Sequence, residues 1–587
     1  MPFRAPVSDH RFLIEHVFRL QDLTSRERYA EVTPDLAQAI LTEAGRLCDE
    51  VIAPLQRAGD THPARLENGV VRTSPGFADG YRAIAEGGWV GMAAAEKHGG
   101  MGLPMLVTTA VNEMMAGACI ALQLNPMLTQ GQIEALELHA SDTLRALYLP
   151  RLTSGEWTGT MNLTEPQAGS DVGALRATAQ ARGDGSYAIS GQKIFITWGD
   201  TDFAANTCHL VLARLPDGVP GTKGISLFLV PKFIPDAAGA PGLANSLKVV
   251  SLEHKLGIHG SPTAVMQYDG AQGWLVGAPH QGMRAMFDMM NNARLGVAAQ
   301  GVGVAEAAFQ AALAYARDRR QGLAPGGGGI IGHADVRRML ATMKAEIFAA
   351  RAIVLSLAQA VDQARAGPSP VAAAWAARAA LLTPIAKAFA TDIGVEVANS
   401  GVQIHGGMGF IEATGAAQFL RDVRITPIYE GTNGIQAMDL AGRKMLDGGA
   451  AAFALLDEVQ RGAGRARASM PALAEAVRAG AEALREATET LNGQDMQDRF
   501  AGAVPYLRAF ARVLGGHYHL LAALAEREAG AEREAGVERE AGAEGGRRAK
   551  LARVYITRLM PEYLGLVAAS GLGAADLYAL SDDDLAA

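Results

Sequence analysis

Cysteine is scarce in this sequence, and its scarcity excludes two kinds of site. Only Cys48, Cys119 and Cys208 occur among the 587 residues, and no two of them have the C-x-x-C spacing. Neither a disulfide framework nor a thiolate metal site is therefore expected. A low cysteine count also suits a reducing compartment, so we expect a cytoplasmic protein that binds no metal.

The chain also lacks a long apolar run and an excess of positive charge. No uninterrupted apolar stretch reaches the ~18 residues that cross a bilayer, and the first ten residues contain no apolar signal core. Lysine and arginine number 53 against 61 aspartate and glutamate, a net charge of −8. This balance argues against a general nucleic-acid binder. We therefore expect a soluble protein with no transmembrane segment and no nucleic-acid partner.

The spacing of apolar residues predicts a mainly α protein with a small central β-domain. Apolar residues recur at three- and four-residue steps, as at 36–52 and 108–122, until short β-type runs replace them. The β-type runs are 187–190, 194–197, 209–213, 225–230 and 264–268. The expected divisions are an N-terminal extension (1–36), an N-terminal helical domain (37–160), a β-domain (161–280), a helical bundle (281–446) and a C-terminal helical domain (447–587).

Three glycine-rich or repetitive segments are expected to carry no chemistry. Gly218, Gly221 and Gly224 lie between two predicted strands, which favours a hairpin turn over a dinucleotide fingerprint. Residues 322–332 indicate a flexible loop. The tandem hexapeptide at 525–542, inside a low-complexity insertion at 525–548, favours a solvated helix-loop or disordered segment over a binding site.

The segment PIYEGTNGIQ, residues 427–436, holds the strongest candidate for a catalytic base. Glu430 is its only carboxylate, placed where an extended segment is expected to end and a helix to begin. Burial beside Ile428 and Tyr429 is expected to raise its pKa and its strength as a base. On the residues alone, a carboxylate that merely favours a helix entry is the alternative interpretation.

Four motifs resemble those of the acyl-CoA dehydrogenases. IYEGT (428–432) resembles the family's catalytic-glutamate segment, and QIHGGMGF (403–410) resembles its flavin motif Q-x-x-G-G-x-G-[FY]. MNLTEPQAGSDV (161–172) is similar to x-T-E-P-x-A-G-S-D, and KIFIT (193–197) to K-x-[WFY]-I-T. The resemblance covers about residues 3–574 and is closest to a long bacterial subgroup. It implies a helical domain, a β-barrel domain and a four-helix bundle, with an added C-terminal helical domain.

The resemblance implies FAD as the cofactor and assigns roles to single residues. Phe195 would cover one face of the flavin ring and Thr197 would bond the ring near N5; being two apart on a strand, they are expected to share a face. Ser170 would contact FAD or the CoA chain, and Tyr429 and Gly431 would adjoin the substrate. The other implied FAD contacts are Met161, Leu163, Thr164, Gly169, Gln403, Gly407 and Thr432.

Two arginines also take roles from the resemblance. Arg294 corresponds to an arginine near the catalytic glutamate and is expected to orient Glu430 or the thioester end of the substrate. Arg319 resembles the arginine that reaches FAD phosphates across a subunit interface, although the family's R-x-x-F-G continuation is absent and a glycine-rich insertion follows. Without the resemblance, an arginine at the end of a helix is expected only to interact favourably with the helix dipole. His405 has no second ligand at metal-binding spacing, so a structural role is expected.

The implied reaction is α,β-desaturation of an acyl-CoA to the trans-2-enoyl-CoA. Glu430 would remove the α-proton, the β-hydrogen would pass as hydride to flavin N5, and the electrons would pass to an electron-transfer flavoprotein. The alternatives are an oxidase of the same fold that uses oxygen and a non-catalytic helical scaffold. Helical residues 472–491 and 504–524 need an apolar surface, so they are expected to pack on their own subunit and leave a homodimer.

Overall fold

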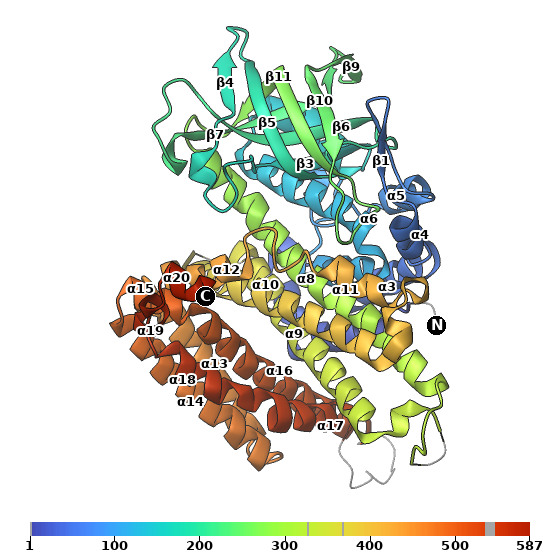
Figure 1. The fold of residues 1–587 in the computed structure, drawn as a ribbon, viewed down its shortest axis with the longest axis vertical. Coiled ribbons are helices and arrows are strands. Elements are labelled where there is room, and N and C mark those ends of the chain that lie inside the picture. The colour runs from blue at the N-terminus through green and yellow to red at the C-terminus, as the bar shows by residue number, and fades with distance from the viewer. Residues whose placement is uncertain (1–2, 326–327, 367–368, 535–545) are drawn as a thin grey trace.

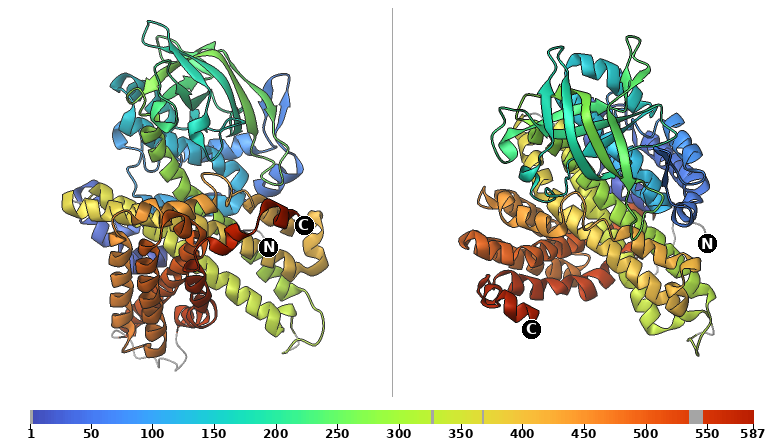
Figure 2. Two further views of the ribbon diagram at one scale, coloured as in Figure 1. Left: turned by 60° about the vertical axis from the view of Figure 1, so that its left-hand side comes forward. Right: turned by 45° about the horizontal axis from the view of Figure 1, so that its top comes forward.

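A β-domain, a layer of long helices and a C-terminal group of helices form three tiers in the computed structural model (Figure 1). It describes residues 3–325, 328–366, 369–534 and 546–587. The two further views keep the C-terminal group beside the long helices and away from the β-domain (Figure 2). The expected fold class, mainly helical with a small central β-domain, is confirmed.

Seven α-helices and a small hairpin form the described N-terminal part of the chain. They are α1 (Val7–Phe12), α2 (Leu20–Thr24), α3 (Pro34–Leu47), α4 (Leu55–Thr61), α5 (Phe77–Glu86), α6 (Met105–His139) and α7 (Asp142–Thr153), with a small hairpin of β1 (Arg65–Glu67) and β2 (Val70–Arg72).

Helix α6 doubles back on itself at Cys119. Cys119 has non-helical angles, φ −159° and ψ 94°, and Asn112 Nδ2 donates to Gln130 Oε1 over 2.8 Å. A straight helix would separate those two residues by roughly 27 Å. The first arm begins at Met105 and Leu106, whose N–H groups donate to the buried carboxylate of Asp362 at 2.7 and 2.8 Å. The single predicted helix at 108–122 is therefore two antiparallel arms.

The β-domain is a closed barrel with two extra edge strands. Its strands are β3 (Trp157–Asn162), β4 (Thr178–Ala181), β5 (Tyr187–Thr197), β6 (Asn206–Arg214), β7 (Ile225–Pro231), β10 (Leu247–Leu252) and β11 (Thr263–Val276). The pairs β11–β5, β5–β4, β4–β6, β6–β7 and β7–β11 close the circle, with β10 and β3 outside it. Closure removes most free strand edges. The sheet begins at Trp157, four residues before the expected start.

The turn glycines of the β-domain lie where hairpin geometry requires them. Strands β6 and β7 pair antiparallel and enclose Gly218, Gly221 and Gly224, as predicted. Gly221 has φ +78°, an angle that glycine adopts without steric cost. A second, two-stranded hairpin of β8 (Phe233–Pro235) and β9 (Pro241–Ala244) completes the domain.

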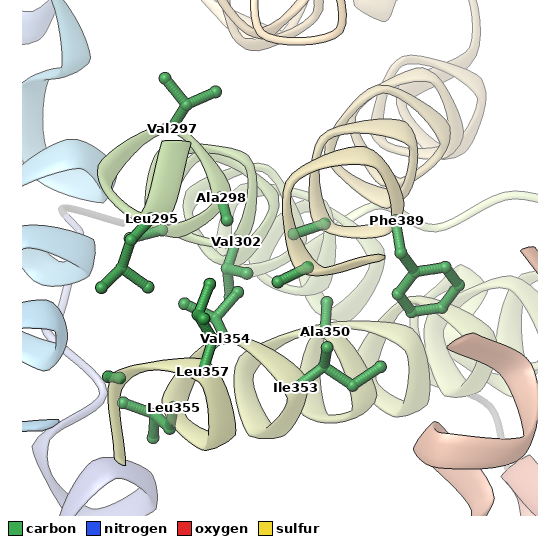
Figure 3. Close-up of a cluster of buried hydrophobic side chains, with 14 of the residues drawn as sticks. Leu295, Val297, Ala298, Val302, Ala350, Ile353, Val354, Leu355, Leu357 and Phe389 are labelled. Carbon is green, nitrogen blue, oxygen red and sulfur yellow. The ribbon is translucent and has the colours of Figure 1, made fainter. Parts of the chain in front are cut away.

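Three long helices form the central layer. They are α8 (Gly282–Asp318), α9 (Ala334–Ala366) and α10 (Ser369–His405), followed by α11 (Ala416–Val423) and α12 (Asn433–Ala441). Val302, Val354 and Phe389 are among the buried side chains between them (Figure 3). A Cβ on Gly301 would lie 2.5 Å from the Ala390 carbonyl oxygen, so α8 and α10 cross at backbone contact. This close crossing fixes the helices that carry the site described below.

The C-terminal helices pack on the same chain. They are α13 (Ala450–Ala466), α14 (Pro471–Gly493), α15 (Met496–Ala501), α16 (Ala503–Glu534), α17 (Arg547–Val554), α18 (Tyr563–Ser570), α19 (Ala575–Ala579) and α20 (Asp582–Ala586). Helix α16 lies against α9, α10 and α12. It continues to Glu534, into the second hexapeptide, where a helix-loop or disorder was predicted; residues 535–545 of the repeat region lie outside the described residues.

A buried charge cluster ties the two ends of the chain to the central layer. Arg351 on α9 is fully buried and donates to Glu113 on α6 and to Glu306 on α8, at 2.8 and 3.0 Å. Asp9 on α1 accepts from Lys344 on α9 at 3.1 Å and from Arg548 on α17 at 3.1 Å. A buried charge destabilises a fold unless a group of opposite charge pairs with it. In this cluster each carboxylate has a basic partner, so the cluster can link these helices without leaving an unpaired charge.

Two helices of the described chain, α6 and α8, are long and apolar enough to cross a membrane. Their most apolar 18-residue stretches are 100% and 78% buried inside the protein. That burial is what core helices of this length show.

Candidate active site

Glu430 lies on a strained loop between two parts of the helical layer. The segment that leads into α12 arches from the helices towards the barrel (Figure 1). Its start is a turn and not the extended segment that was predicted, because the N–H groups of Ile428 and Tyr429 both donate to the Ile425 carbonyl. Glu430 (φ +57°) and Gly431 (φ +88°) are both left-handed. For a glutamate this conformation costs about 1–2 kcal/mol, so the surroundings must hold it.

Two cations hold the loop by its carbonyl oxygens. Arg294 Nε donates to the Glu430 carbonyl oxygen at 3.2 Å, and Lys387 Nζ donates to the Gly431 carbonyl oxygen at 2.9 Å. Within the described part of the chain, the Glu430 carboxylate accepts no hydrogen bond. The expectation that Arg294 lies near Glu430 therefore has a specific form, in which the guanidinium contacts the backbone and leaves both carboxylate oxygens open.

The proton affinity of Glu430 is raised. Burial raises its pKa from 4.5 to about 7, although the positive charges of Arg294 and Lys387 act in the opposite direction. A carboxylate with a pKa near the working pH is deprotonated often enough to act and is basic enough to take a proton from carbon. The loop therefore presents a base whose oxygens are unbonded and whose proton affinity suits neutral pH.

The N–H groups of the same loop are also open. Among the described residues, none accepts from the N–H of Glu430, Gly431 or Thr432. Successive left-handed residues direct such donors to one side and form a site for an oxygen that carries negative charge. Thr432 is the N-cap of α12, and its hydroxyl oxygen accepts from the Ile435 N–H at 3.2 Å. That bond leaves the Thr432 hydroxyl proton for another acceptor.

Tyr429 belongs to a buried polar chain that sequence reasoning missed. Its hydroxyl donates to Gln300 Oε1 on α8, and Gln300 Nε2 donates to Gln123 Oε1 on α6 at 2.7 Å. Lys387 and Gln436, which also bond the loop, were not predicted either. Gln123, Gln300 and Lys387 are distant in sequence from the IYEGT motif, and a lysine or glutamine within an apolar helical run is their only sequence signal. Gln436 ends the segment 427–436, but nothing in that segment indicates that its side chain bonds back to the loop.

The predicted ring-contacting residues come together at one edge of the barrel. The N–H of Ile194 donates to the Thr164 carbonyl oxygen at 2.9 Å, and Lys193 Nζ donates to the Leu163 carbonyl oxygen at 3.0 Å. The end of β3 and the end of β5 are therefore adjacent, which places Met161, Leu163 and Thr164 beside Phe195 and Thr197.

Strand β5 is irregular where Phe195 lies. Pairing with β11 shifts between Ala264 and Met266, and Phe195 has φ +59°. The bulge lies before Ile196, and from Phe195 to Thr197 the burial still alternates, with Ile196 buried between an exposed Phe195 and a half-buried Thr197. That Phe195 and Thr197 share a face stays a prediction, and the Phe195 ring is 58% exposed. Such an exposed aromatic ring fits a flat cofactor stacked on it.

The other predicted cofactor residues lie at the far end of the helical layer. Gln403 and Gly407 are at the end of α10, roughly 24 Å along that helix from Lys387. Arg319 follows the end of α8, roughly 35 Å along from Arg294, and is exposed. The ring of Tyr315 stacks on that of His405, with 4.5 Å between their centroids. Arg319 and the glycine turn, residues 406–410, therefore lie at the same end of the helical layer. Within one chain they are not brought to Glu430.

The glycine turn is open, as a phosphate site requires. A Cβ built on Gly406 or Gly407 would meet no atom within 4 Å, and neither would one on Gly169 in the loop after β3. Ser170 is exposed in that loop. Met408, Phe410 and other apolar side chains around the turn are exposed, Phe410 by 86%. The residues present therefore fit FAD in two parts, a ring edge at the barrel and an open glycine turn at the bundle end.

His405 has a structural role, as predicted. Its Nδ1 lies 2.7 Å from the Gly401 carbonyl oxygen, and its ring stacks on Tyr315. No group of three potential His, Cys, Asp or Glu ligands exists among the described residues. The three cysteines are all buried and free.

Comparisons with known proteins agree with this architecture. Family models described as "Acyl-CoA dehydrogenase, N-terminal domain", "middle domain" and "C-terminal domain" match residues 34–156, 160–271 and 280–445. A fourth, "Acetyl-CoA dehydrogenase C-terminal like", matches 455–581. A protein of Ruegeria pomeroyi named 3-methylmercaptopropionyl-CoA dehydrogenase is 47% identical over 538 residues, covering 89% of this chain and 91% of that one.

Two solved structures share the fold over nearly the whole chain. One is Caenorhabditis elegans ACDH-11 in complex with C11-CoA, with a TM-score of 0.75 and 21% identity, covering 92% of this chain and 89% of that one. The other is an acyl-CoA dehydrogenase of Bacillus anthracis complexed with FAD, with a TM-score of 0.73 and 20% identity, covering 94% and 90%. At these identities the likeness establishes the fold.

Proposed function

The chain belongs to the acyl-CoA dehydrogenase family of FAD-dependent oxidoreductases, and from this premise we propose that Glu430 is the base for α,β-desaturation of an acyl-CoA thioester. The observation that carries the proposal is the loop itself. Its carboxylate is unbonded within the described chain, has a raised pKa, and is held by contacts to the backbone alone.

The loop supplies both groups that α-proton removal needs. Glu430 takes the proton from the α-carbon, and the negative charge that develops on the thioester oxygen is stabilised by the open N–H groups of the same left-handed turn. Arg294 adds a positive charge beside the Glu430 carbonyl oxygen. Base and oxyanion donors on one rigid turn keep their relative positions during the reaction.

FAD, when bound, supplies the acceptor for the β-hydrogen, which leaves as hydride. Phe195, Thr197, Met161, Leu163 and Thr164 would hold its ring at the barrel edge. Thr432, Gly169 and Ser170 would adjoin the cofactor or the CoA chain from the loops on either side.

We propose 3-methylmercaptopropionyl-CoA as the first substrate to test, since a relative with that name is 47% identical. The test is anaerobic loss of flavin absorbance with a panel that includes this thioester, butyryl-CoA and a long-chain acyl-CoA. A matched experiment in air with electron-transfer flavoprotein separates the two acceptors. Reduction of that flavoprotein supports a dehydrogenase, and stoichiometric hydrogen peroxide would establish an oxidase instead.

Removing either ring contact is expected to weaken FAD retention. Phe195→Ala deletes the exposed aromatic ring that would stack on the flavin, and Thr197→Ala deletes a hydroxyl near it on the same strand. Both variants should fold, because neither side chain is in the buried core. Gel filtration followed by absorbance at 450 nm measures retained flavin, with Phe233→Ala, on a different hairpin, as the control. Wild-type retention with an unchanged flavin spectrum would contradict the placement.

We further propose that the functional unit is a homodimer in which Arg319, Gln403 and Gly407 of one chain serve the FAD of the other. This is supported by their distance along α8 and α10 from the Glu430 loop and by the exposed apolar side chains of Met408 and Phe410 beside them. Helix α16 of the C-terminal group packs on α9, α10 and α12. In the proposed dimer these C-terminal helices cover the face on which a second pair of subunits would otherwise dock.

The assembly prediction is tested by light scattering on the purified holoenzyme. A mass of two chains is expected, near 123 kDa from the 61.4 kDa of one chain doubled. Phe410→Asp should shift the mass towards one chain and release FAD together, because both depend on the same surface. A tetramer would contradict the role of the C-terminal helices, and a monomer with full FAD occupancy would contradict the shared site.

A further inference from the structure

Lys387 is a buried lysine directed at the Glu430 loop. It lies in the middle of α10 with a relative exposure of 0%. Its Nζ donates to the Gly431 carbonyl oxygen and to Asn433 Oδ1, both at 2.9 Å. Within the described residues it has no carboxylate partner within ion-pair distance. A fully buried ammonium group that bonds only loop and amide oxygens is unusual, because burial without a counter-charge is costly.

The same face of α10 fixes the beginning of α12 through Asn433. The Asn433 side-chain nitrogen donates to Asp392 Oδ1 at 2.7 Å, to Thr391 Oγ1 at 2.9 Å and to the Ala388 carbonyl oxygen at 3.1 Å. Lys387, Ala388, Thr391 and Asp392 occur at one-turn spacing on that helix face. The loop between Tyr429 and Asn433 is thus bonded at its centre by Lys387 and at its end by the residues of the next turn.

Bonds to these carbonyls oppose relaxation of the strained turn. Rotation of the Glu430–Gly431 or Gly431–Thr432 peptide out of the left-handed region would turn a carbonyl oxygen away from Arg294 or Lys387. The buried Nζ would then lose one of its two described acceptors. The cost of an unpaired buried charge exceeds the strain of one left-handed glutamate, so the ammonium group stabilises the turn.

The charges that face this site come from three helices and a turn. Arg294 is on α8, Lys387 and Asp392 are on α10, and Asp439 is on α12, while Arg443 and Lys444 follow α12. Burial lowers the pKa of Lys387 to about 7, against the effect of Glu430 and Asp392. Protonated Lys387 and ionised Glu430 stabilise each other. Removing the lysine therefore removes a positive charge that favours the ionised base.

We propose that Lys387 is a positioning residue for Glu430: through the Gly431 carbonyl and Asn433 it holds the loop in the conformation that presents the carboxylate, and its charge favours ionisation of that carboxylate. The inference rests on the proposed function, in which Glu430 is the base. Lys387 contacts the backbone and an amide, so it acts through the loop.

The test compares Lys387→Met, Lys387→Arg and Lys387→Gln with wild-type holoenzyme. The readout is the pH dependence of anaerobic flavin bleaching by the best acyl-CoA of the panel. Lys387→Met should move the acid limb of the profile up by about one pH unit and lower the plateau ~10- to 100-fold. Lys387→Arg keeps the charge and should keep the acid limb in place. Lys387→Gln should shift the limb as Met does, with a higher plateau than Met because its amide can still donate.

A second readout does not depend on turnover. Infrared difference spectra of the holoenzyme across pH report the carboxylic-acid band of Glu430, identified by its loss in Glu430→Gln. In Lys387→Met this band should persist to higher pH. Lys344→Met is the control, since it removes a lysine from the separate buried charge cluster. It should lower the thermal midpoint without moving the acid limb or the band.

The proposal would be overturned if Lys387→Met had the same acid limb, plateau rate and infrared band as wild type. It would also be overturned if Lys387→Met lost thermal stability but its pH profile did not shift. The experiment distinguishes failure of the proposed function from failure of this inference. An active Glu430→Gln would overturn both, whereas an inactive Glu430→Gln with a normal Lys387→Met overturns only the role of Lys387.

Discussion

Replacing Glu430 with glutamine is expected to lower acyl-CoA desaturation by at least ~100-fold while FAD and acyl-CoA binding remain nearly intact, because general-base catalysis is typically worth that much or more. The substitution keeps the size of the side chain and the backbone bonds from Arg294 and Lys387, which contact carbonyl oxygens and not the carboxylate. Only the proton acceptor is lost. Anaerobic single-turnover bleaching measures the rate, and a substrate-induced shift of the flavin spectrum measures binding.

The pH dependence of the wild-type rate provides an independent check on the same residue. Because the base must be ionised, the rate should rise as pH increases through the Glu430 pKa of about 7. This raised pKa also means that folding favours the protonated form, so Glu430 reduces stability as pH rises from 4.5 towards 7. Glu430→Gln should therefore have a thermal midpoint at or above that of wild type, with the larger difference at pH 8. Normal bleaching in the variant would refute the assignment.

Replacing Arg351 with methionine is expected to cost about 3–5 kcal/mol of stability, because it leaves Glu113 and Glu306 as buried charges without their shared partner. Methionine has a similar volume, so little of the loss would come from packing. Denaturant unfolding followed by circular dichroism measures the change. Arg46→Met is the matched control, since Arg46 makes exposed pairs with Glu43 and Glu50 and its removal should leave stability nearly unchanged.

The deficit in Arg351→Met should depend on pH in a defined direction. Burial raises the pKa of Glu113, but Arg351 and His10 outweigh it and hold that pKa at about 2 in the folded protein. A depressed pKa contributes stability above the unfolded value of about 4.5 and loses it as pH falls towards 2. Without Arg351, the buried carboxylates would instead be stabilised by protonation. The difference between variant and wild type should therefore be largest near pH 7 and narrow towards pH 4; a difference independent of pH would contradict this origin.

The sequence predicted the elements of this fold well, because apolar period and glycine punctuation act locally. The strands at 209–213 and 225–230 and the helices at 472–491 and 504–524 occur where their patterns predict them. The reversal at Cys119 was not predicted. Both arms of α6 are buried on nearly all sides, so the apolar pattern continues through the reversal and carries no signal of it.

The candidate site was predicted only as far as its motifs extend. IYEGT locates Glu430, and KIFIT locates Phe195 and Thr197, but the bulge before Ile196 depends on pairing with β11, some 70 residues later. Lys387 and Gln300 reach the loop from other helices, and their contacts exist only after α8, α10 and α6 have packed. Long-range bonds of this kind have no periodicity in a single sequence.

The bonds of Asp9 also have a consequence for the time course of synthesis. Its carboxylate pairs with Arg547 and Arg548, 538 and 539 residues further along the chain. At a translation rate of about 5–20 residues per second, these arginines emerge roughly half a minute to two minutes after Asp9. Until then, Asp9 can pair only with Lys344 and Arg351 of α9, and only after that helix has itself been made. The ion pairs of Asp9 with Arg547 and Arg548 therefore form late in synthesis. In a nascent chain this charge cluster stays incomplete until the C-terminal helices leave the ribosome.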